Sequence, residues 1–187
     1  MSHTIQQQRI SIKHLRVADF ASEETLCFSA TVLFDGKPVA EASNDGRGGA
    51  TYLRPLSRDR TSLADAEAFA ATLPDYVTDD DATDDPSKRL TIAMTLDFLV
   101  DLLVEDMLSN RKLRAAFQRD IRNKALFIRQ GRLVFVKGVK LKTVPDRPRL
   151  YQQIRDQFGS DIVVLNELPI EDAFALWKAH MVDREAD

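Results

Sequence analysis

Alternating apolar and polar positions mark the first quarter of the chain as β structure. Apolar side chains recur at every second position over residues 26–34, which is the period of a strand with one buried face. Asp35-Gly36 follows at once, and this pair favours a type I′ turn because both of its residues adopt positive φ. The pattern predicts an antiparallel meander, with strands over residues 10–15, 26–34, 37–43 and 49–53.

Apolar residues spaced by three and four positions predict the helices. The longest such pattern predicts one helix over about 87–119, or two helices broken near Ser109. Asp85 and Pro86 suit its beginning, because Asp is a favourable N-cap and Pro fits the first helical turn. Shorter helices are predicted over residues 63–73, 149–158 and 169–180.

Two β-rich runs near residue 130 predict a hairpin. Residues 126–128 and 133–136 flank a turn at 129–132. Residues 139–144 alternate and extend this hairpin as a half-exposed strand, and residues 161–165 form a short β run. The chain is therefore predicted to be α+β, with an N-terminal antiparallel β-meander, a long central helix, and a C-terminal β-hairpin with short helices.

The acidic stretch 74–86 divides the chain. It holds six Asp and no basic residue, a composition typical of a solvated loop or linker. Residues 1–73 are then a β-rich N-terminal lobe with a short helix, and residues 87–187 are an α+β C-terminal lobe. The alternative is that the chain forms one continuous compact domain.

Composition narrows the class of protein. Apolar residues make up 44% and charged residues 29% of the 187 positions, which is ordinary for a soluble globular protein. Cys27 is the single cysteine and cannot form an internal disulfide, so a secreted disulfide scaffold is excluded. Acidic residues interrupt the apolar stretches before they reach the ~20 residues of a membrane span, and the polar N-terminus lacks a signal-peptide core. We expect a cytoplasmic protein that does not bind membranes.

The net charge of −3 conceals a strong asymmetry along the chain. Residues 59–106 hold 13 acidic and three basic residues, whereas residues 111–149 hold 13 basic and two acidic residues. Such asymmetry bears on partners rather than on the fold. Clustered Lys and Arg can neutralise a row of phosphates, which makes affinity fall steeply with salt. The residues predicted to contact nucleic acid are Arg111, Lys112, Arg114, Arg119, Arg122, Lys124, Arg129, Arg132, Lys137, Lys140 and Lys142.

Aromatic residues lie among these charges. Phe117, Phe127 and Phe135 would stack on bases if they were exposed. Alternatively, they belong to the core while the charges solvate the opposite face. In a third arrangement the acidic segment covers the basic one inside the molecule.

The most distinctive string is the glycine-rich stretch at residues 43–50, which predicts a loop. Consecutive N–H groups in such a loop can cradle an anion, and its arginine suits phosphate or carboxylate. The loop lacks the Lys-Ser/Thr ending of a phosphate-binding loop and does not match the dinucleotide fingerprint. A tight turn that requires several positive φ angles is the favoured alternative. The candidate ligand-loop residues are Asn44, Asp45, Gly46, Arg47, Gly48 and Gly49.

Three strings in the N-terminal region carry a family resemblance. They are Ser22-Glu23-Glu24-Thr25-Leu26-Cys27-Phe28-Ser29-Ala30, Asp35-Gly36-Lys37 and the glycine-rich loop, and residues 161–169 fit the same impression. Together the three strings resemble the opening module of small uncharacterised proteins from bacterial phages and integrated mobile elements, over roughly residues 10–53. The resemblance implies an accessory protein of a mobile element, and it carries no catalytic residue.

Acidic residues offer two further interpretations. Asp97, Asp101 and Glu105 share one helix face, where carboxylates can hold a hard cation or act as acid and base, but a solvated face is the favoured interpretation. The acidic loop lacks the glycine and closing Glu of a calcium loop, yet it can mimic a phosphate backbone for a basic partner. Its candidate protein-binding residues are Asp79, Asp80, Asp81, Asp84 and Asp85.

No catalytic or metal-binding pattern stands out in the sequence. The three His are far apart and form no pair at ligand spacing, and Cys27 has no neighbouring His. No cofactor is expected. The leading hypothesis is a non-catalytic protein that contacts nucleic acid through residues 111–149. The competing hypothesis is an inhibitor or adaptor that uses residues 59–106 to engage a basic host protein, and an enzyme ranks third.

Overall fold

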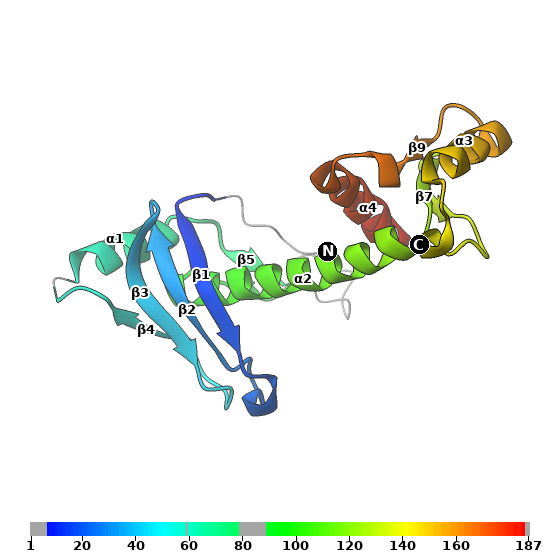
Figure 1. The fold of residues 1–187 in the computed structure, drawn as a ribbon. Coiled ribbons are helices and arrows are strands. Elements are labelled where there is room, and N and C mark those ends of the chain that lie inside the picture. Colours follow the sequence, from blue (N-terminus) through cyan, green and yellow to red (C-terminus); the bar gives the residue numbers. More distant parts are fainter. Residues whose placement is uncertain (1–6, 59, 79–88, 186–187) are drawn as a thin grey trace. The chain divides into compact units, whose positions relative to one another are not determined.

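The computed structural model describes residues 7–58, 60–78 and 89–185 and confirms the α+β fold. The chain divides into two compact units, Met1–Met107 and Leu108–Asp187, which we call the N-terminal and C-terminal units (Figure 1). The division falls inside a long helix, whereas the sequence placed it at residues 74–86. Within the described residues, no helix combines the length and the hydropathy needed to cross a membrane.

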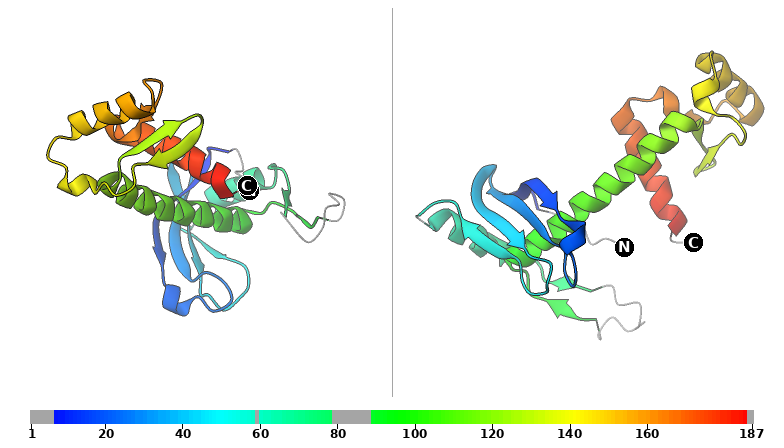
Figure 2. Two further views of the ribbon diagram at one scale, coloured as in Figure 1. Left: turned by 90° about the vertical axis from the view of Figure 1, so that its right-hand side faces the viewer. Right: turned by 60° about the horizontal axis from the view of Figure 1, so that its bottom comes forward.

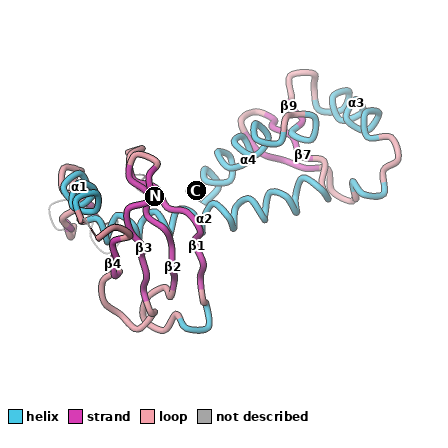
Figure 3. The backbone as a smooth tube through the Cα atoms, turned by 60° about the vertical axis from the view of Figure 1, so that its left-hand side comes forward, coloured by secondary structure: helices cyan, strands magenta, loops and turns pink. Residues whose placement is uncertain are grey.

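A four-stranded antiparallel sheet forms most of the N-terminal unit. Its strands are β1 (Ile10–Val17), β2 (Phe28–Phe34), β3 (Lys37–Asn44) and β4 (Tyr52–Pro55), in the order β1-β2-β3-β4 (Figure 3). The predicted meander is therefore confirmed. Asp35 and Gly36 connect β2 to β3 with φ of 47° and 77°, as a type I′ turn requires. The last strand begins at Tyr52 rather than at the expected Gly49, because positive φ angles at Gly48 and Gly49 keep that segment in a loop.

A β-bulge changes the orientation of side chains in β1. Strict alternation from Ile10 would place His14 on the buried face and Leu15 on the exposed face, but β1 does not alternate strictly. Lys13 pairs with Thr31 and Arg16 pairs with Ser29, so two residues of β1 oppose one residue of β2. His14, at φ 55°, occupies the extra position and is exposed, while its neighbour Leu15 is buried.

The inner face of this sheet packs on helices. Helix α1 (Thr61–Ala70) places Phe69 against Phe34, with ring centroids 5.8 Å apart. The first three turns of α2 (Leu96–Asn123) bury Leu99, Val100 and Val104. A small antiparallel ladder joins β5 (Tyr76–Val77) to β6 (Thr91–Ile92), and a short 3-10 helix, η1, spans Asp19–Ala21.

Helix α2 differs from its prediction at both ends. It begins at Leu96 rather than Ser87, since the chain at 91–92 pairs in β6, and it ends at Asn123 rather than near Arg119. It also runs without interruption past Ser109. Asp85 and Pro86, the proposed helix entry, lie outside the described residues, as do Asp79, Asp80, Asp81 and Asp84.

The C-terminal unit contains a three-stranded sheet. The hairpin β7 (Leu126–Arg129) and β8 (Arg132–Phe135) is confirmed, and β9 (Val163–Val164) pairs with β7 to give the order β8-β7-β9. Its other elements are η3 (Leu141–Thr143), α3 (Arg147–Phe158), η4 (Leu165–Glu167) and α4 (Ile170–Glu185). The strand predicted over 139–144 is wrong: Gly138, at φ 79°, turns the chain, and a 3-10 turn buries Leu141.

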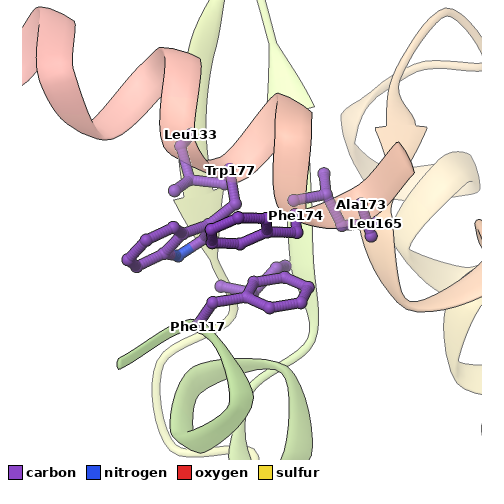
Figure 4. Packing of buried hydrophobic residues seen from close by; sticks show 7 residues of the cluster. Phe117, Leu133, Leu165, Ala173, Phe174 and Trp177 are labelled. Atoms are coloured by element: carbon purple, nitrogen blue, oxygen red, sulfur yellow. The ribbon is translucent and has the colours of Figure 1, made fainter. Parts of the chain in front are cut away.

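This smaller sheet has a core on each of its two faces. On one face, Phe117 of α2 packs against Phe174 and Trp177 of α4, with ring centroids 5.4 and 5.7 Å away (Figure 4). Figure 2 shows α4 crossing the C-terminal half of α2. On the other face, Phe127 packs with residues of α3, including Tyr151 and Ile154. Charged residues of this unit therefore lie on its helices, in its turns and loops, and at the turn-side ends of the hairpin strands, where Arg129 and Arg132 are exposed.

Candidate nucleic-acid interface

Four exposed basic residues follow one side of the C-terminal half of α2. Because successive helical residues are about 100° apart, Arg111, Lys112, Arg119 and Arg122 fall within a sector of about 100°. Phe117 lies on the opposite side and fills the core. We call these four residues the basic stripe, and their exposure follows from burial of the apolar side of the same helix.

Three exposed lysines lie beyond the hairpin. Lys137, Lys140 and Lys142, here called the basic loop, flank and enter the 3-10 turn η3. The strand predicted over 139–144 would have included Lys140 and Lys142, but no strand forms there. Burial of Leu141 in the core fixes the turn and leaves the lysines on its outer side.

Other predicted contact residues have partners within the chain. Arg114 donates two hydrogen bonds to Glu171, at 2.9 and 2.7 Å, and its guanidinium lies 4.4 Å from the ring centroid of Phe174. This pairing raises the pKa of Arg114 and lowers the pKa of the Glu171 carboxyl, chiefly through the side-chain hydrogen bonds. Arg114 therefore joins α2 to α4.

Lys124 and Arg129 are also engaged. Lys124 Nζ lies 2.9 Å from Asp120 and 4.8 Å from the ring centroid of Phe135. The guanidinium of Arg129 lies 5.4 Å from the ring centroid of Phe158. By contrast, within the described part of the chain, no ion pair engages Arg119, Arg122, Arg132 or the basic loop.

The aromatic residues within the basic segment, residues 111–149, have different roles. Phe117 and Phe127 are each 2% exposed, so both belong to the core and neither can stack on a base. Phe135 is 42% exposed at the end of β8, beside Lys124. Of the three rings considered, Phe135 alone presents a surface to a ligand.

The glycine-rich loop is bonded to its own unit. Gly46 N–H donates to Asn44 Oδ1 at 2.9 Å, and Gly48 N–H donates to Thr25 Oγ1 at 3.2 Å. Arg47 N–H donates to the Asp45 side chain at 3.2 Å, while the Arg47 side chain is exposed. With three of its N–H groups already bonded, the loop is a tight turn with φ of 84°, 91° and 90° at its three glycines.

A buried polar network ties this loop to α2. Asn44 accepts a hydrogen bond from Thr25 at 2.8 Å, and its amide reaches Thr51, which is 4% exposed. Thr51 Oγ1 in turn donates to Asp101 at 2.5 Å. Burial raises the pKa of Asp101, against the effect of the Thr51 hydrogen bond, and the nearby Asp97 carboxylate raises it further. The sequence singled out Asp101 for its helix face, but its partner Thr51 gave no signal.

Beside this network lies an acidic cleft of about 560 Å³. Leu26, Phe28 and Phe98 contribute apolar walls. Its carboxylates come from the segment before β2 and from α2, and they are those of Glu23, Glu24, Asp101 and Glu105. Within the described residues, no group of His, Cys, Asp or Glu is arranged to hold a metal ion.

Comparison of the chain with models of protein families, with curated proteins and with solved structures gives no match.

Proposed function

We propose that the C-terminal unit binds nucleic acid through the basic stripe, the basic loop and Arg132. The observation that carries this proposal is that seven of these side chains are exposed and free of ion pairs within the described residues: Lys112, Arg119, Arg122, Arg132, Lys137, Lys140 and Lys142. Such side chains attract phosphates without first losing an internal partner.

The charge of the whole unit supports the same proposal. Residues 108–187 hold 16 basic and 10 acidic residues, for a net charge of +6, whereas residues 1–107 hold 10 basic and 19 acidic residues, for −9. A positive field over the C-terminal unit favours approach of a polyanion. We further propose that the protein acts in the cytoplasm, in keeping with the mobile-element resemblance of its N-terminal strings.

Charge reversal of the basic loop tests the proposal. We expect the variant K137E/K140E/K142E to bind fluorescently labelled duplex DNA and RNA at least about tenfold more weakly, across all sequences, because phosphate contacts carry no sequence information. The matched control, K37E/R58E/R60E, makes the same change in net charge at exposed positions of the N-terminal unit. Equal loss in both variants would indicate a general charge effect and contradict the proposed surface.

The acidic cleft supports a second candidate function. Its carboxylates and apolar walls fit a basic side chain of a partner protein, in line with the expectation that residues 59–106 engage such a partner. We expect a Lys- and Arg-rich peptide to bind the parent and to lose affinity for E24Q/E105Q. Unchanged affinity would exclude the cleft as the binding surface.

A further inference from the structure

The outer face of the four-stranded sheet is open and polar. Where the inner face packs on helices, the outer face presents exposed Lys13 and Arg16 from β1, Ser29 from β2, and Ser43 from β3. Helices of the described N-terminal unit contribute no lining residue to a hollow of about 420 Å³ on this face. Exposed polar side chains on four paired strands give this hollow a rigid floor.

The strand register aligns these side chains in rows. Arg16 pairs with Ser29, Ser29 with Ser43, and Ser43 with Tyr52, so one row crosses all four strands. The neighbouring row runs through Thr31, Glu41 and Arg54. All seven residues of the two rows line the hollow.

The bulge in β1 adds to the positive charge of this face. Without the extra residue, alternation would direct Arg16 to the buried face and Leu15 outward. With it, Lys13, His14 and Arg16 are all exposed, and His14 Nδ1 lies 3.4 Å from Thr31 Oγ1. The positive φ of His14 is uncommon for a residue with a side chain, and such bulges often re-aim side chains at sites.

The charge of the hollow is opposite to that of its unit. Its one carboxylate, Glu41, forms an ion pair with Arg54, whereas Arg16 has no ion pair among the described residues. Tyr52 is 65% exposed at the end of the Arg16 row. The face thus combines an arginine, hydroxyl groups and an exposed aromatic ring.

We propose that this outer sheet face binds a short segment of single-stranded nucleic acid. Tyr52 stacks on a base, Arg16 contacts a phosphate, and the Ser29 and Ser43 hydroxyls between them bond to sugar or base edges. A flat row of polar side chains suits unstacked bases, whereas a duplex offers no exposed base face to Tyr52. The site lies in the N-terminal unit and does not depend on the basic surfaces proposed above.

Photo-crosslinking and binding to the full chain test this proposal. We expect a 12-nucleotide single strand that carries 5-iodouracil to crosslink to Tyr52, with both the deoxyribose and the ribose form as probes. We expect Y52A to bind single strands about tenfold more weakly, Y52F to bind like the parent because it keeps the ring, and R16A to lose affinity with a smaller salt dependence. Duplex binding should be unchanged in Y52A.

A matched control separates this site from other aromatic surfaces and from the basic loop. F20A removes another exposed ring of the same unit, 94% exposed in η1, and should leave single-strand binding unchanged. In K137E/K140E/K142E, the Tyr52 crosslink should persist even where overall affinity falls. The proposal is overturned if Y52A binds single strands like the parent, if F20A weakens binding equally, or if crosslinks map only to the C-terminal unit.

Discussion

The two units use their sheets in opposite ways. In the four-stranded sheet, α1 and α2 cover one face and the other face is open, so polar side chains of the sheet itself are exposed to solvent. The three-stranded sheet is covered on both faces by separate apolar clusters. Its unit therefore presents charge from a helix, from a loop and from Arg132 at the turn of the hairpin. When both faces of a sheet are covered, a ligand can contact only residues of the surrounding helices, turns and loops. When one face is open, the sheet itself can be the binding surface.

Each unit also contains an asparagine that satisfies backbone groups. Asn44 bonds to Gly46 and Gly49 of the glycine-rich loop in the N-terminal unit. Asn166 bonds to Leu126 N–H at 2.8 Å and to the carbonyls of Ile121 and Lys124 at 2.9 and 3.1 Å. Asn166 thereby joins the end of α2 to the beginning of β7.

The largest expected effect on stability comes from a cavity in the core of the C-terminal unit. F117A removes a ring that is 2% exposed and contacts Trp177, and should lower the free energy of unfolding of the C-terminal unit by about 3–5 kcal/mol. Trp177 is the single tryptophan, so its fluorescence in urea reports this unit. F28A opens the core of the N-terminal unit. It should lower the urea midpoint measured by far-UV circular dichroism and leave the midpoint of the Trp177 fluorescence transition unchanged. Equal shifts of both signals in both variants would mean that the units unfold together.

The asparagines provide a finer comparison. N166A leaves Leu126 N–H and two carbonyls without their partner. It should lower the free energy of unfolding of the C-terminal unit by about 2 kcal/mol, seen as a lower urea midpoint of the Trp177 fluorescence transition. N44A should instead destabilise the N-terminal unit, seen by circular dichroism. N166D keeps the acceptor for Leu126 N–H but places a carboxylate oxygen against the two carbonyl oxygens, so it should be at least as destabilising as N166A at neutral pH. If N166D were as stable as the parent, the two carbonyl bonds would contribute nothing.

Two glycines of the same loop separate steric contact from backbone strain. A Cβ added at Gly46 would lie 2.1 Å from Ala21 O, whereas one at Gly49 would have nothing within 4 Å. Because both residues have positive φ, G49A should cost about 1 kcal/mol from strain alone and G46A clearly more. Thermal denaturation of the two variants measures this difference. Equal melting temperatures would argue against close packing of Gly46.

The smallest expected effect concerns Asp101. Its raised pKa means that the folded state favours the protonated form, so its contribution to stability is present below the ordinary Asp pKa and is lost as pH rises through the raised value. D101N stays neutral and does not lose this contribution. The stability of D101N relative to the parent should therefore increase from about pH 3 to pH 7, measured by urea unfolding. D106N, which removes the same charge from an exposed position of the same helix, is the matched control, and an equal trend in both variants would contradict burial of Asp101 as the cause.

Local signals explain what the sequence could predict. Asp35-Gly36 and Gln130-Gly131 are turns whose backbone angles depend on their own residues, so both hairpins were found. The β1 bulge could not be predicted, because the identity of the extra residue depends on pairing with β2. The alternating residues 139–144 resemble a strand, yet Gly138 turns the chain and Leu141 fills a core that only the fold defines.

The sequence predicted the location of the candidate nucleic-acid interface but not which of its basic residues are free to bind. Charge counts located the basic segment, but they could not separate exposed Arg119 from Arg114, whose partner Glu171 lies 57 residues away. The row from Arg16 to Tyr52 gave no signal, because its members are scattered over four strands and are ordinary surface residues when taken singly.

The salt dependence of duplex binding tests the central claim most directly, namely that the basic side chains of the C-terminal unit contact phosphates. We predict that log Kd rises linearly with log salt concentration for the parent, and that R119A/R122A reduces the slope by about 2. The matched variant R58A/R60A, at exposed positions of the N-terminal unit, should keep the parent slope. A parent that shows no binding at low salt, or an R119A/R122A slope equal to that of the parent, would contradict the account.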